Sequence, residues 1–246
     1  QGYDSIGFVP TMGALHEGHL SLVRQSKKEC ALTIVSVFVN PTQFGPSEDF
    51  DQYPRSYEAD CELLAKEGVD YVFLPDVETI YPNGVDRLLK VSVPHLSTQF
   101  CGVSRPHFFD GVCQVVMRLL SLIKPSVLFL GEKDFQQSCV IKQLLQDTES
   151  PVQLVVCPIK REVSGLAFSS RNRYLTEEQR KHASKVYQTL KALRLRCEDS
   201  LSIEDALSII HHSLPHSLGF RLDYFAFVTD DCEAVAMSKK ASRLLI

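Results

Sequence analysis

The chain has 246 residues, of which 44% are hydrophobic and 23% charged, and its formal net charge is -4 at pH 7. These values are typical of a globular protein with a substantial core, and the negative balance argues against nucleic acid as the main partner. No apolar run approaches the length needed to cross a bilayer, so no membrane partner is expected. The chain starts without Met and enters its first strand almost at once, which suggests a trimmed N-terminus or a fragment.

The segment Ile6–His19 reads as a short buried strand, a turn marked by Gly13, and the start of a helix. A strand that feeds a helix through such a turn aims backbone N–H groups and the positive end of the helix dipole at one point. His16 and His19 are three residues apart, so on the first helical turn they share a face. The combination favours an anion that gains charge during a reaction, in practice a phosphate.

Two other interpretations of these histidines exist. Each one alone is typical of a surface or capping residue, and His16-Glu17 also opens the zinc motif H-E-x-x-H. The second histidine of that motif arrives one position early, and no cysteine or third histidine follows nearby. Phosphate chemistry therefore fits this segment better than zinc.

The rest of the first half alternates strands with helices, which predicts an α/β fold with a parallel sheet and right-handed crossovers. Helices are expected over 56–66, 111–123 and behind 134 through 145, the first ended by Gly68. Buried strands are expected at 32–39, 71–74, 127–130 and 152–156, with a further strand at 88–93.

Polar residues follow the predicted strands at their carboxyl ends. Asn40 and Gln43 follow the second strand, and Lys133 and Asp134 follow the fourth. Ligands of parallel sheets bind at those ends, where the strand order reverses. We therefore expect these residues to meet the histidine turn at one edge of the sheet.

Beyond residue 159 the alternation of predicted strands and helices gives way to a polar loop. This change predicts two domains, 1–159 and 160–246. The second is expected to be a smaller α+β domain. Its polar loop over 161–172 precedes a helix that Thr176 and Gln179 cap, and a helix at 203–212 and a strand at 221–228 follow.

The eight cysteines show no C-x-x-C spacing, and several lie inside apolar runs. We interpret them as reduced, largely buried thiols of a cytoplasmic protein. They are Cys30, Cys61, Cys101, Cys113, Cys139, Cys157, Cys197 and Cys232.

Four blocks of the sequence resemble the pantothenate synthetase family, in that family's order and spacing. They are Pro10–His19, Phe38–Gly45, Gly131–Gln137 and Ser169–Asn172. The histidine block resembles the H-x-G-H signature of the wider nucleotidylyltransferase superfamily, and the serine block stands where that superfamily has its K-M-S-K-S-like loop. The resemblance implies a Rossmann-like sheet of the H-x-G-H type, with a C-terminal lid domain that carries the Ser-Ser-Arg loop.

The resemblance also implies a reaction, the ATP-dependent condensation of pantoate with β-alanine to give pantothenate, AMP and pyrophosphate. A pantoyl-adenylate forms first, and the amine then attacks it. ATP is a co-substrate, Mg²⁺ is expected on its phosphates and held largely by water and substrate oxygens, and the family is typically a homodimer.

By the same resemblance each block receives a role. Pantoate is expected at Gln43 and Gln137, with Asn40 in the same pocket and Gln43 also near β-alanine. Asp60 is a candidate magnesium contact, although a charge on an exposed helix usually only meets solvent. The residues expected to stabilise the transition state are His16, His19 (also the proton donor), Lys133, Ser169, Ser170 and Arg171. The residues expected to contact ATP are Met12, Gly13, Ala14, Leu15, His16, Glu17, Gly18, His19, Gly131, Glu132, Lys133, Asp134, Lys160, Phe168, Ser169, Ser170 and Arg171.

The chain departs from the family pattern in several places. Ser164 stands where the family usually has Asp, Lys160 where it often has Val, and Arg105–Phe109 replaces the block R-P-G-H-F. Against that pattern we also expect a shorter tail and no leading helix. Two alternatives therefore stay open: a superfamily enzyme with a different acceptor, and a non-catalytic relative.

Overall fold

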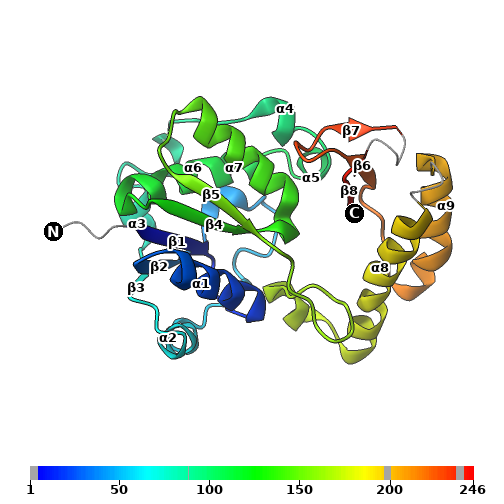
Figure 1. The fold of residues 1–246 in the computed structure, drawn as a ribbon, viewed down its shortest axis with the longest axis horizontal. Coiled ribbons are helices and arrows are strands. Elements are labelled where there is room, and N and C mark those ends of the chain that lie inside the picture. The colour runs from blue at the N-terminus through cyan, green and yellow to red at the C-terminus, as the bar shows by residue number, and fades with distance from the viewer. Residues whose placement is uncertain (1–4, 88, 197–200, 237–240) are drawn as a thin grey trace. The chain divides into compact units, whose positions relative to one another are not determined.

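The computed structural model describes residues 5–87, 89–196, 201–236 and 241–246. Contacts between residues divide the chain into two compact units, Gln1–Lys160 and Arg161–Ile246, and each is described by itself (Figure 1). In the part of the chain that is described, no helix is both long enough and apolar enough to span a membrane.

The first unit is built on a five-stranded parallel sheet in the order β3-β2-β1-β4-β5. The chain runs outward from β1 to β3 and then crosses to β4 on the other side of β1, so the order reverses between β1 and β4. The predicted α/β fold with a Rossmann-like sheet is confirmed. The strands are β1 (Ile6–Thr11), β2 (Leu32–Val37), β3 (Tyr71–Phe73), β4 (Val127–Gly131) and β5 (Gln153–Cys157).

Pairing is uneven across this sheet. All six residues of β1 pair with β2, and all five residues of β4 pair with β5. Between β1 and β4 the register has only two pairs, Gly7 with Val127 and Phe8 with Leu128. Among the described residues, the carboxyl halves of β1 and β4 therefore have no ladder pairing with each other. We call this line the β1–β4 seam.

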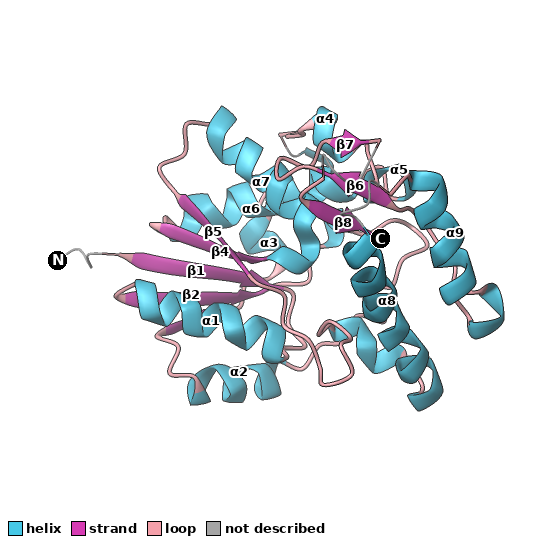
Figure 2. Ribbon diagram, turned by 45° about the vertical axis from the view of Figure 1, so that its right-hand side comes forward, coloured by secondary structure: helices cyan, strands magenta, loops and turns pink. Residues whose placement is uncertain are grey.

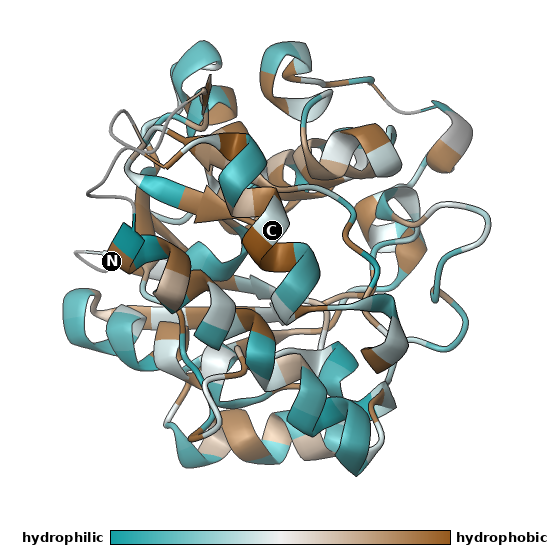
Figure 3. Cartoon of the chain, turned by 90° about the vertical axis from the view of Figure 1, so that its right-hand side faces the viewer, coloured by the Kyte–Doolittle hydropathy of each residue, from teal (hydrophilic) through white to brown (hydrophobic). Residues whose placement is uncertain are grey.

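Helices cover both faces of the sheet (Figure 2). On one face lie α1 (Glu17–Glu29) and α2 (Tyr57–Lys66), and on the other lie α6 (Phe108–Ile123) and α7 (Phe135–Asp147). Each of these helices buries one side, and the cartoon coloured by hydropathy shows helices that carry both hydrophilic and hydrophobic residues (Figure 3). The apolar stripes meet the sheet in a core that contains Val9, Val23, Val35, Leu64 and Phe129, all fully buried.

The predicted boundaries hold for α2 and shift by two or three residues for β2 and α6. Helix α2 follows Ser56 and ends before Gly68, whose φ of +68° is the left-handed conformation that favours glycine after a helix. Strand β2 ends at Val37, two residues early, because its partner β1 ends at Thr11. Helix α6 starts three residues earlier than predicted, at Phe108.

The predicted strand at 88–93 is wrong for the described residues 89–93. This stretch has no strand partner, Leu89 is 78% exposed, and Pro94 then starts a short helix. Leu88 itself lies outside the described residues. The segment between β3 and α6 is instead made of short helical turns: α3 (Val77–Ile80), η2 (Val85–Arg87), α4 (Pro94–Ser97) and α5 (Cys101–Ser104).

The second unit is α+β, with a three-stranded antiparallel sheet in the order β7-β6-β8. The predicted strand at 221–228 is correct only for β6 (Ala226–Val228), because its partners β7 (Ala234–Val235) and β8 (Arg243–Leu245) are too short to pair residues 221–225. Two helices, α8 (Glu177–Arg196) and α9 (Ile203–Ser213), pack a small core around Leu193, Ile210 and Phe227.

Candidate active site

The two histidines lie at the start of α1, just after the turn that connects it to β1. His16 is the N-cap of the helix, with φ −148° and ψ 174°, and His19 is one turn further on. Their rings stack, with centroids 4.0 Å apart and planes 19° from parallel. The predicted shared face is therefore present, and it presents two imidazoles at the positive end of a 13-residue helix.

The turn before the histidines has an unusual backbone. Gly13 has φ +83° and Ala14 has φ +50°, so two consecutive residues are left-handed. The amide of Gly13 donates to Thr11 Oγ1 at 3.2 Å, and the amides of Ala14 and Leu15 donate to Asp60 at 2.9 and 2.8 Å. These three N–H groups face the protein. The N–H groups of the first turn of α1 have no acceptor within the helix itself, as at any helix N-terminus, so they are the ones that an anion could use.

The prediction that Asp60 is a solvent-exposed charge on a helix is wrong. It lies on the inner side of α2 and is only 1% exposed. Its two carboxylate oxygens each accept one of the turn amides, Oδ2 that of Ala14 and Oδ1 that of Leu15. Since a magnesium ion also needs room for bound water, this enclosed carboxylate does not suit a metal contact.

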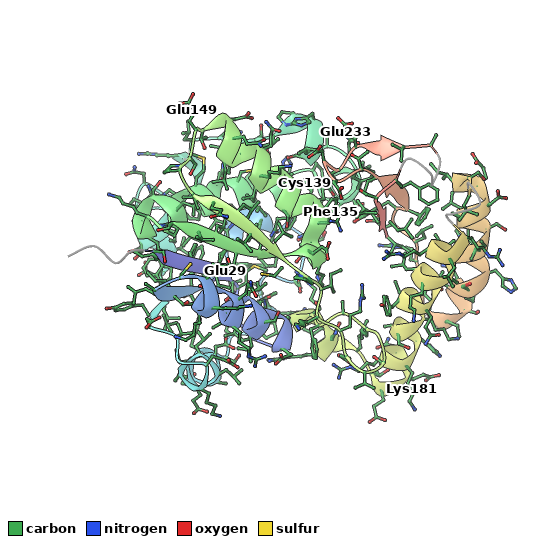
Figure 4. All side chains as sticks on the ribbon, in the orientation of Figure 1. Glu29, Phe135, Cys139, Glu149, Lys181 and Glu233 are labelled. Carbon is green, nitrogen blue, oxygen red and sulfur yellow. The ribbon has the colours of Figure 1, made fainter. Side chains whose placement is uncertain are left out.

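Lys133 and Asp134 follow β4, next to β1 in the sheet. They sit in the turn η3 (Glu132–Asp134), both are exposed, and Lys133 Nζ lies 3.1 Å from Asp134 Oδ1. Helix α7 starts directly after them, and Phe135 and Cys139, one helical turn apart, are buried on its inner side (Figure 4). That anchorage leaves the preceding lysine at the edge of the sheet.

The histidines and Lys133 share one electrostatic environment. The pKa of His19 falls from 6.5 to about 3, first because burial of much of the ring disfavours its charged form, then because His16 and Lys133 add positive potential. The His19 side chain is partly exposed, yet its Nδ1 is enclosed and, among the described residues, has no hydrogen-bond partner. His19 is therefore neutral at pH 7 before any ligand binds. Because Lys133 lowers the pKa of His19, the residues that follow β1 and β4 lie within electrostatic reach of each other, as predicted.

This shift makes a prediction about stability. Between pH 3 and pH 6.5 the unfolded chain binds a proton at His19 that the folded chain does not, so the free energy of unfolding should rise with pH and level off above pH 6.5. We expect His19→Gln to flatten that rise in urea unfolding measured from about pH 4 to about pH 8. Equal slopes for the variant and the parent protein would contradict the lowered pKa.

Asn40 and Gln43 form a buried polar cluster after β2. Asn40 is 1% exposed, and its Nδ2 donates to Gln43 Oε1 and to the Gly111 carbonyl, both at 3.1 Å. Its Oδ1 accepts from Tyr81 Oη at 2.7 Å and from Thr42 Oγ1 at 3.1 Å. Gln43, 8% exposed, also places Nε2 3.1 Å from Met12 Sδ. The second predicted block is thus joined to the first.

The remaining predicted residues of the first unit are near the same edge. Gln137 is half-buried on the first turn of α7, and Lys160 is exposed after β5. Sequence reasoning missed Gln136, which is 5% exposed and donates to the carbonyls of Leu96 and Gln99. It fixes the start of α7 to the segment before α6, and no local pattern indicated that role.

In the altered block 105–109, Arg105 contacts Phe108, Glu48 and Gln43. The Arg105 guanidinium lies 3.8 Å from the centre of the Phe108 ring and pairs with both carboxylate oxygens of Glu48. Its Nη2 also lies 3.4 Å from the Gln43 carbonyl. Arg105 therefore braces the Gln43 loop, and Phe108 is the surface on which it stacks.

The serine loop belongs to the second unit. Ser169 caps the turn η4 (Ser170–Tyr174) by accepting the Arg171 amide at 3.3 Å, Ser170 is buried, and Arg171 is exposed. Asn172 Nδ2 donates to the Ala167 carbonyl at 2.9 Å and closes the loop. The approach of this loop to the histidines stays a prediction.

The hinge of the loop explains one departure from the family pattern. The Ser164 hydroxyl accepts the Leu166 amide at 3.3 Å, which is the bond that an aspartate makes in such a turn. Gly165 has φ +91°, and a Cβ there would lie 2.6 Å from Cδ1 of Tyr187 on α8. The predicted Thr176–Gln179 capping box that starts α8 is confirmed, since each side chain accepts the other's amide.

Among the residues that the structure describes, no three His, Cys, Asp or Glu side chains gather in a way that could hold a metal ion. The seven described cysteines are thiols, four of them buried, and Cys197 lies outside the described residues.

Comparison with known proteins decides the family. The profile described as pantoate-beta-alanine ligase matches residues 1–246. The chain belongs to this family. Curated pantothenate synthetases match it at 48% identity in Caldicellulosiruptor bescii, covering 98% of this chain and 85% of that one, and at 47% in Acinetobacter baylyi, covering 93% and 78%.

Solved structures of pantoate–β-alanine ligases agree with the fold. Pantothenate synthetase from Thermus thermophilus superposes with a TM-score of 0.88 at 42% identity, covering 95% of this chain and 85% of that one. The pantoate–β-alanine ligase from Francisella tularensis, complexed with beta-gamma ATP and β-alanine, has a TM-score of 0.81 at 39% identity and covers 92% and 82%. The resemblance of the four sequence blocks to the family is confirmed.

Proposed function

We propose that the chain condenses pantoate with β-alanine at the expense of ATP, through a pantoyl-adenylate, and releases AMP and pyrophosphate. One observation carries this proposal: the reversal of strand order between β1 and β4 puts a stacked histidine pair and a lysine at one point of the sheet edge. The relative from Francisella tularensis, whose structure holds beta-gamma ATP and β-alanine, supports the same choice of substrates.

The chemistry of adenylation suits these residues. A pantoate carboxylate that attacks the α-phosphorus builds negative charge on the phosphate oxygens and on the departing pyrophosphate. The Lys133 ammonium and the first-turn amides of α1 can stabilise that charge without moving. His19 and His16 can donate ring N–H groups to the same oxygens.

The protonation of His19 follows from its surroundings. The free site holds the ring neutral, because burial, His16 and the Lys133 ammonium disfavour its charged form. A bound triphosphate brings several negative charges and reverses that balance, so it raises the pKa of His19. We propose that His19 becomes a proton donor to the phosphates only when ATP is present.

Magnesium enters the proposal as part of the substrate, MgATP. The described side chains offer no carboxylate cluster, and the Asp60 oxygens are engaged by backbone amides. The phosphate oxygens and water then provide the ligands that Mg²⁺ prefers.

Pantoate is assigned to the cluster after β2 and the start of α7. Gln43 and Gln137 are amides, which can donate to a carboxylate and accept from a hydroxyl with one side chain. Asn40 holds the Gln43 amide through its 3.1 Å hydrogen bond, so it fixes which way that amide presents its oxygen. Gln43 is also the proposed neighbour of β-alanine.

Gln43→Ala should weaken the use of pantoate more than the use of ATP. The substitution removes an amide assigned to pantoate but leaves the histidines and Lys133 in place. We expect the KM for pantoate to rise about tenfold or more, with a much smaller change in the KM for ATP. Steady-state kinetics with each substrate varied in turn measures the two KM values. An equal rise in both would contradict the assignment of Gln43 to pantoate.

The loop Phe168–Arg171 of the second unit is proposed to complete the ATP site, with that unit acting as a lid. Hydroxyls of Ser169 and Ser170 and the Arg171 guanidinium are groups that bind phosphates. We also propose a cytoplasmic homodimer. The thiol cysteines support a reducing compartment, and the dimer rests on the resemblance to the family.

One assay tests the function. AMP release is measured with ATP, pantoate and β-alanine, and then with each omitted in turn. The proposal requires AMP release to stop when any one of the three is omitted, because AMP leaves only when the amine attacks the adenylate, and pantothenate to form only with all three. AMP release that ignores β-alanine but needs another amine would favour a different acceptor, and no turnover with any set would favour a non-catalytic relative.

A further inference from the structure

We propose that Asp60 is a positioning residue for the ATP chemistry: its buried carboxylate locks the turn Gly13–Leu15 and thereby sets the place of the two stacked histidines. This inference rests on the proposed function, because it concerns how the same site is built. In this role the Asp60 carboxylate binds backbone amides of the protein and not a metal ion.

The contacts of Asp60 reach across 45 residues of sequence. The side chain comes from α2, yet its Oδ1 accepts the Leu15 amide at 2.8 Å and its Oδ2 the Ala14 amide at 2.9 Å. Hydrogen bonds from amides to a buried carboxylate are among the stronger ones in proteins, since the acceptor is charged and water does not compete. Asp60 therefore holds two successive amides at fixed points.

The turn needs such a restraint. Ala14 has φ +50°, a conformation that costs an alanine roughly 1 kcal/mol and persists only where the surroundings impose it. A Cβ at Gly13 would lie 2.9 Å from both Asp60 Oδ2 and Val37 Cγ1, so the carboxylate lies directly against the turn. Thr11 Oγ1 secures the other end by accepting the Gly13 amide.

The restraint is transmitted to the histidines over a very short distance. Leu15, whose amide Asp60 binds, directly precedes His16, and its side chain is only 3% exposed. His16 caps α1, so the direction in which α1 leaves the turn follows from where Leu15 is held. His19 lies on the first turn of the same helix and stacks on His16, so its position follows from the same direction.

Asp60 also decides which amides a phosphate can use. By taking the N–H groups of Ala14 and Leu15, it removes them from the set that could bind an anion. The triphosphate is then left with the first-turn amides of α1, on the side where the imidazoles lie. Displacement of a bound substrate by about 1 Å can cost about 10²-fold in rate, so the direction of the helix matters.

The main test uses Asp60→Asn. The amide oxygen of asparagine can accept one of the two bonds, but its NH₂ group faces the other backbone N–H as a second donor. Single-turnover formation of pantoyl-adenylate should slow by about tenfold or more, while the KM for β-alanine stays within about twofold. Hydrogen exchange at the Ala14 and Leu15 amides should quicken.

Two matched controls separate positioning from loss of stability. Glu58→Gln removes an exposed carboxylate from the same helix and should change nothing. Ser26→Ala breaks a buried 2.8 Å bond to Thr33 at the far end of α1, so it should lower stability with the adenylation rate intact. If Asp60→Asn fails to fold, Thr11→Val tests the same turn, because it removes the acceptor of the Gly13 amide.

Each outcome decides the inference. A native adenylation rate in a folded Asp60→Asn protein, or a loss of stability alone as in Ser26→Ala, would overturn it. So would a raised Mg²⁺ requirement in the variant, because a positioning residue leaves the metal dependence of the parent unchanged. Amide exchange tests the anchor without any substrate, whereas failure of the parent protein to release AMP with ATP, pantoate and β-alanine together would refute the proposed function alone.

Discussion

His19→Ala is expected to lower turnover by about 10²-fold or more, with the fold retained. The centroid of the His19 ring lies 4.0 Å from that of His16, and Lys133 adds positive potential at His19. This is the point where we place the phosphates. Alanine removes a donor that acts most strongly when the phosphate oxygens carry their greatest charge. The kcat with saturating ATP, pantoate and β-alanine measures the loss.

The matched control for this variant is His212→Ala, which removes an exposed histidine from the end of α9. It should leave kcat unchanged. A His19→Ala protein with native unfolding behaviour and kcat within about threefold of the parent would show that the imidazole is not used in the transition state.

The second large effect is expected for Asn40→Ala. Its side chain joins Gln43, Thr42, Tyr81 and the Gly111 carbonyl, and Asn40 is 1% exposed, so truncation leaves several buried polar groups without partners. We expect a loss of about 3 kcal/mol in the free energy of unfolding, together with a higher KM for pantoate. Urea unfolding and pantoate kinetics measure the two effects.

Asn40→Asp separates the two consequences. The carboxylate still accepts from Tyr81 Oη but cannot donate to Gln43 Oε1, so the amide of Gln43 loses its orientation while part of the network survives. The control is Asn83→Ala, at an exposed asparagine. An unchanged KM for pantoate in both Asn40 variants would show that this cluster does not contribute to pantoate binding.

Much of the fold was predictable because parallel sheets leave strong local signals. The run Leu32–Val37 is rich in β-branched residues and is covered on both faces. Gly68 and Thr176 mark helix ends by chemistry that needs no distant partner. The meeting of His19 with Lys133 was also predictable, since both follow strands and the topology brings the carboxyl ends together.

The errors arose where partners decide the structure. Residues 221–225 have strand-like composition, but the neighbouring strands β7 and β8 are too short to form ladder pairs with them. Asp60 looked like a solvated charge because the amides that bind it are 45 and 46 residues away. One local signal existed: Asp60 and Leu64 are one helical turn apart, so an acid occupied the stripe that α2 buries.

The β1–β4 seam has a consequence for how the molecule deforms. Two half-sheets, each continuously bonded, meet there through only the pairs at Gly7 and Phe8. Parting them farther along breaks no ladder bonds across that line, whereas bending either half would strain many. The imidazoles follow β1 and the Lys133 ammonium follows β4, so packing, including that of α1 on β4, sets the spacing between them where ladder bonds do not.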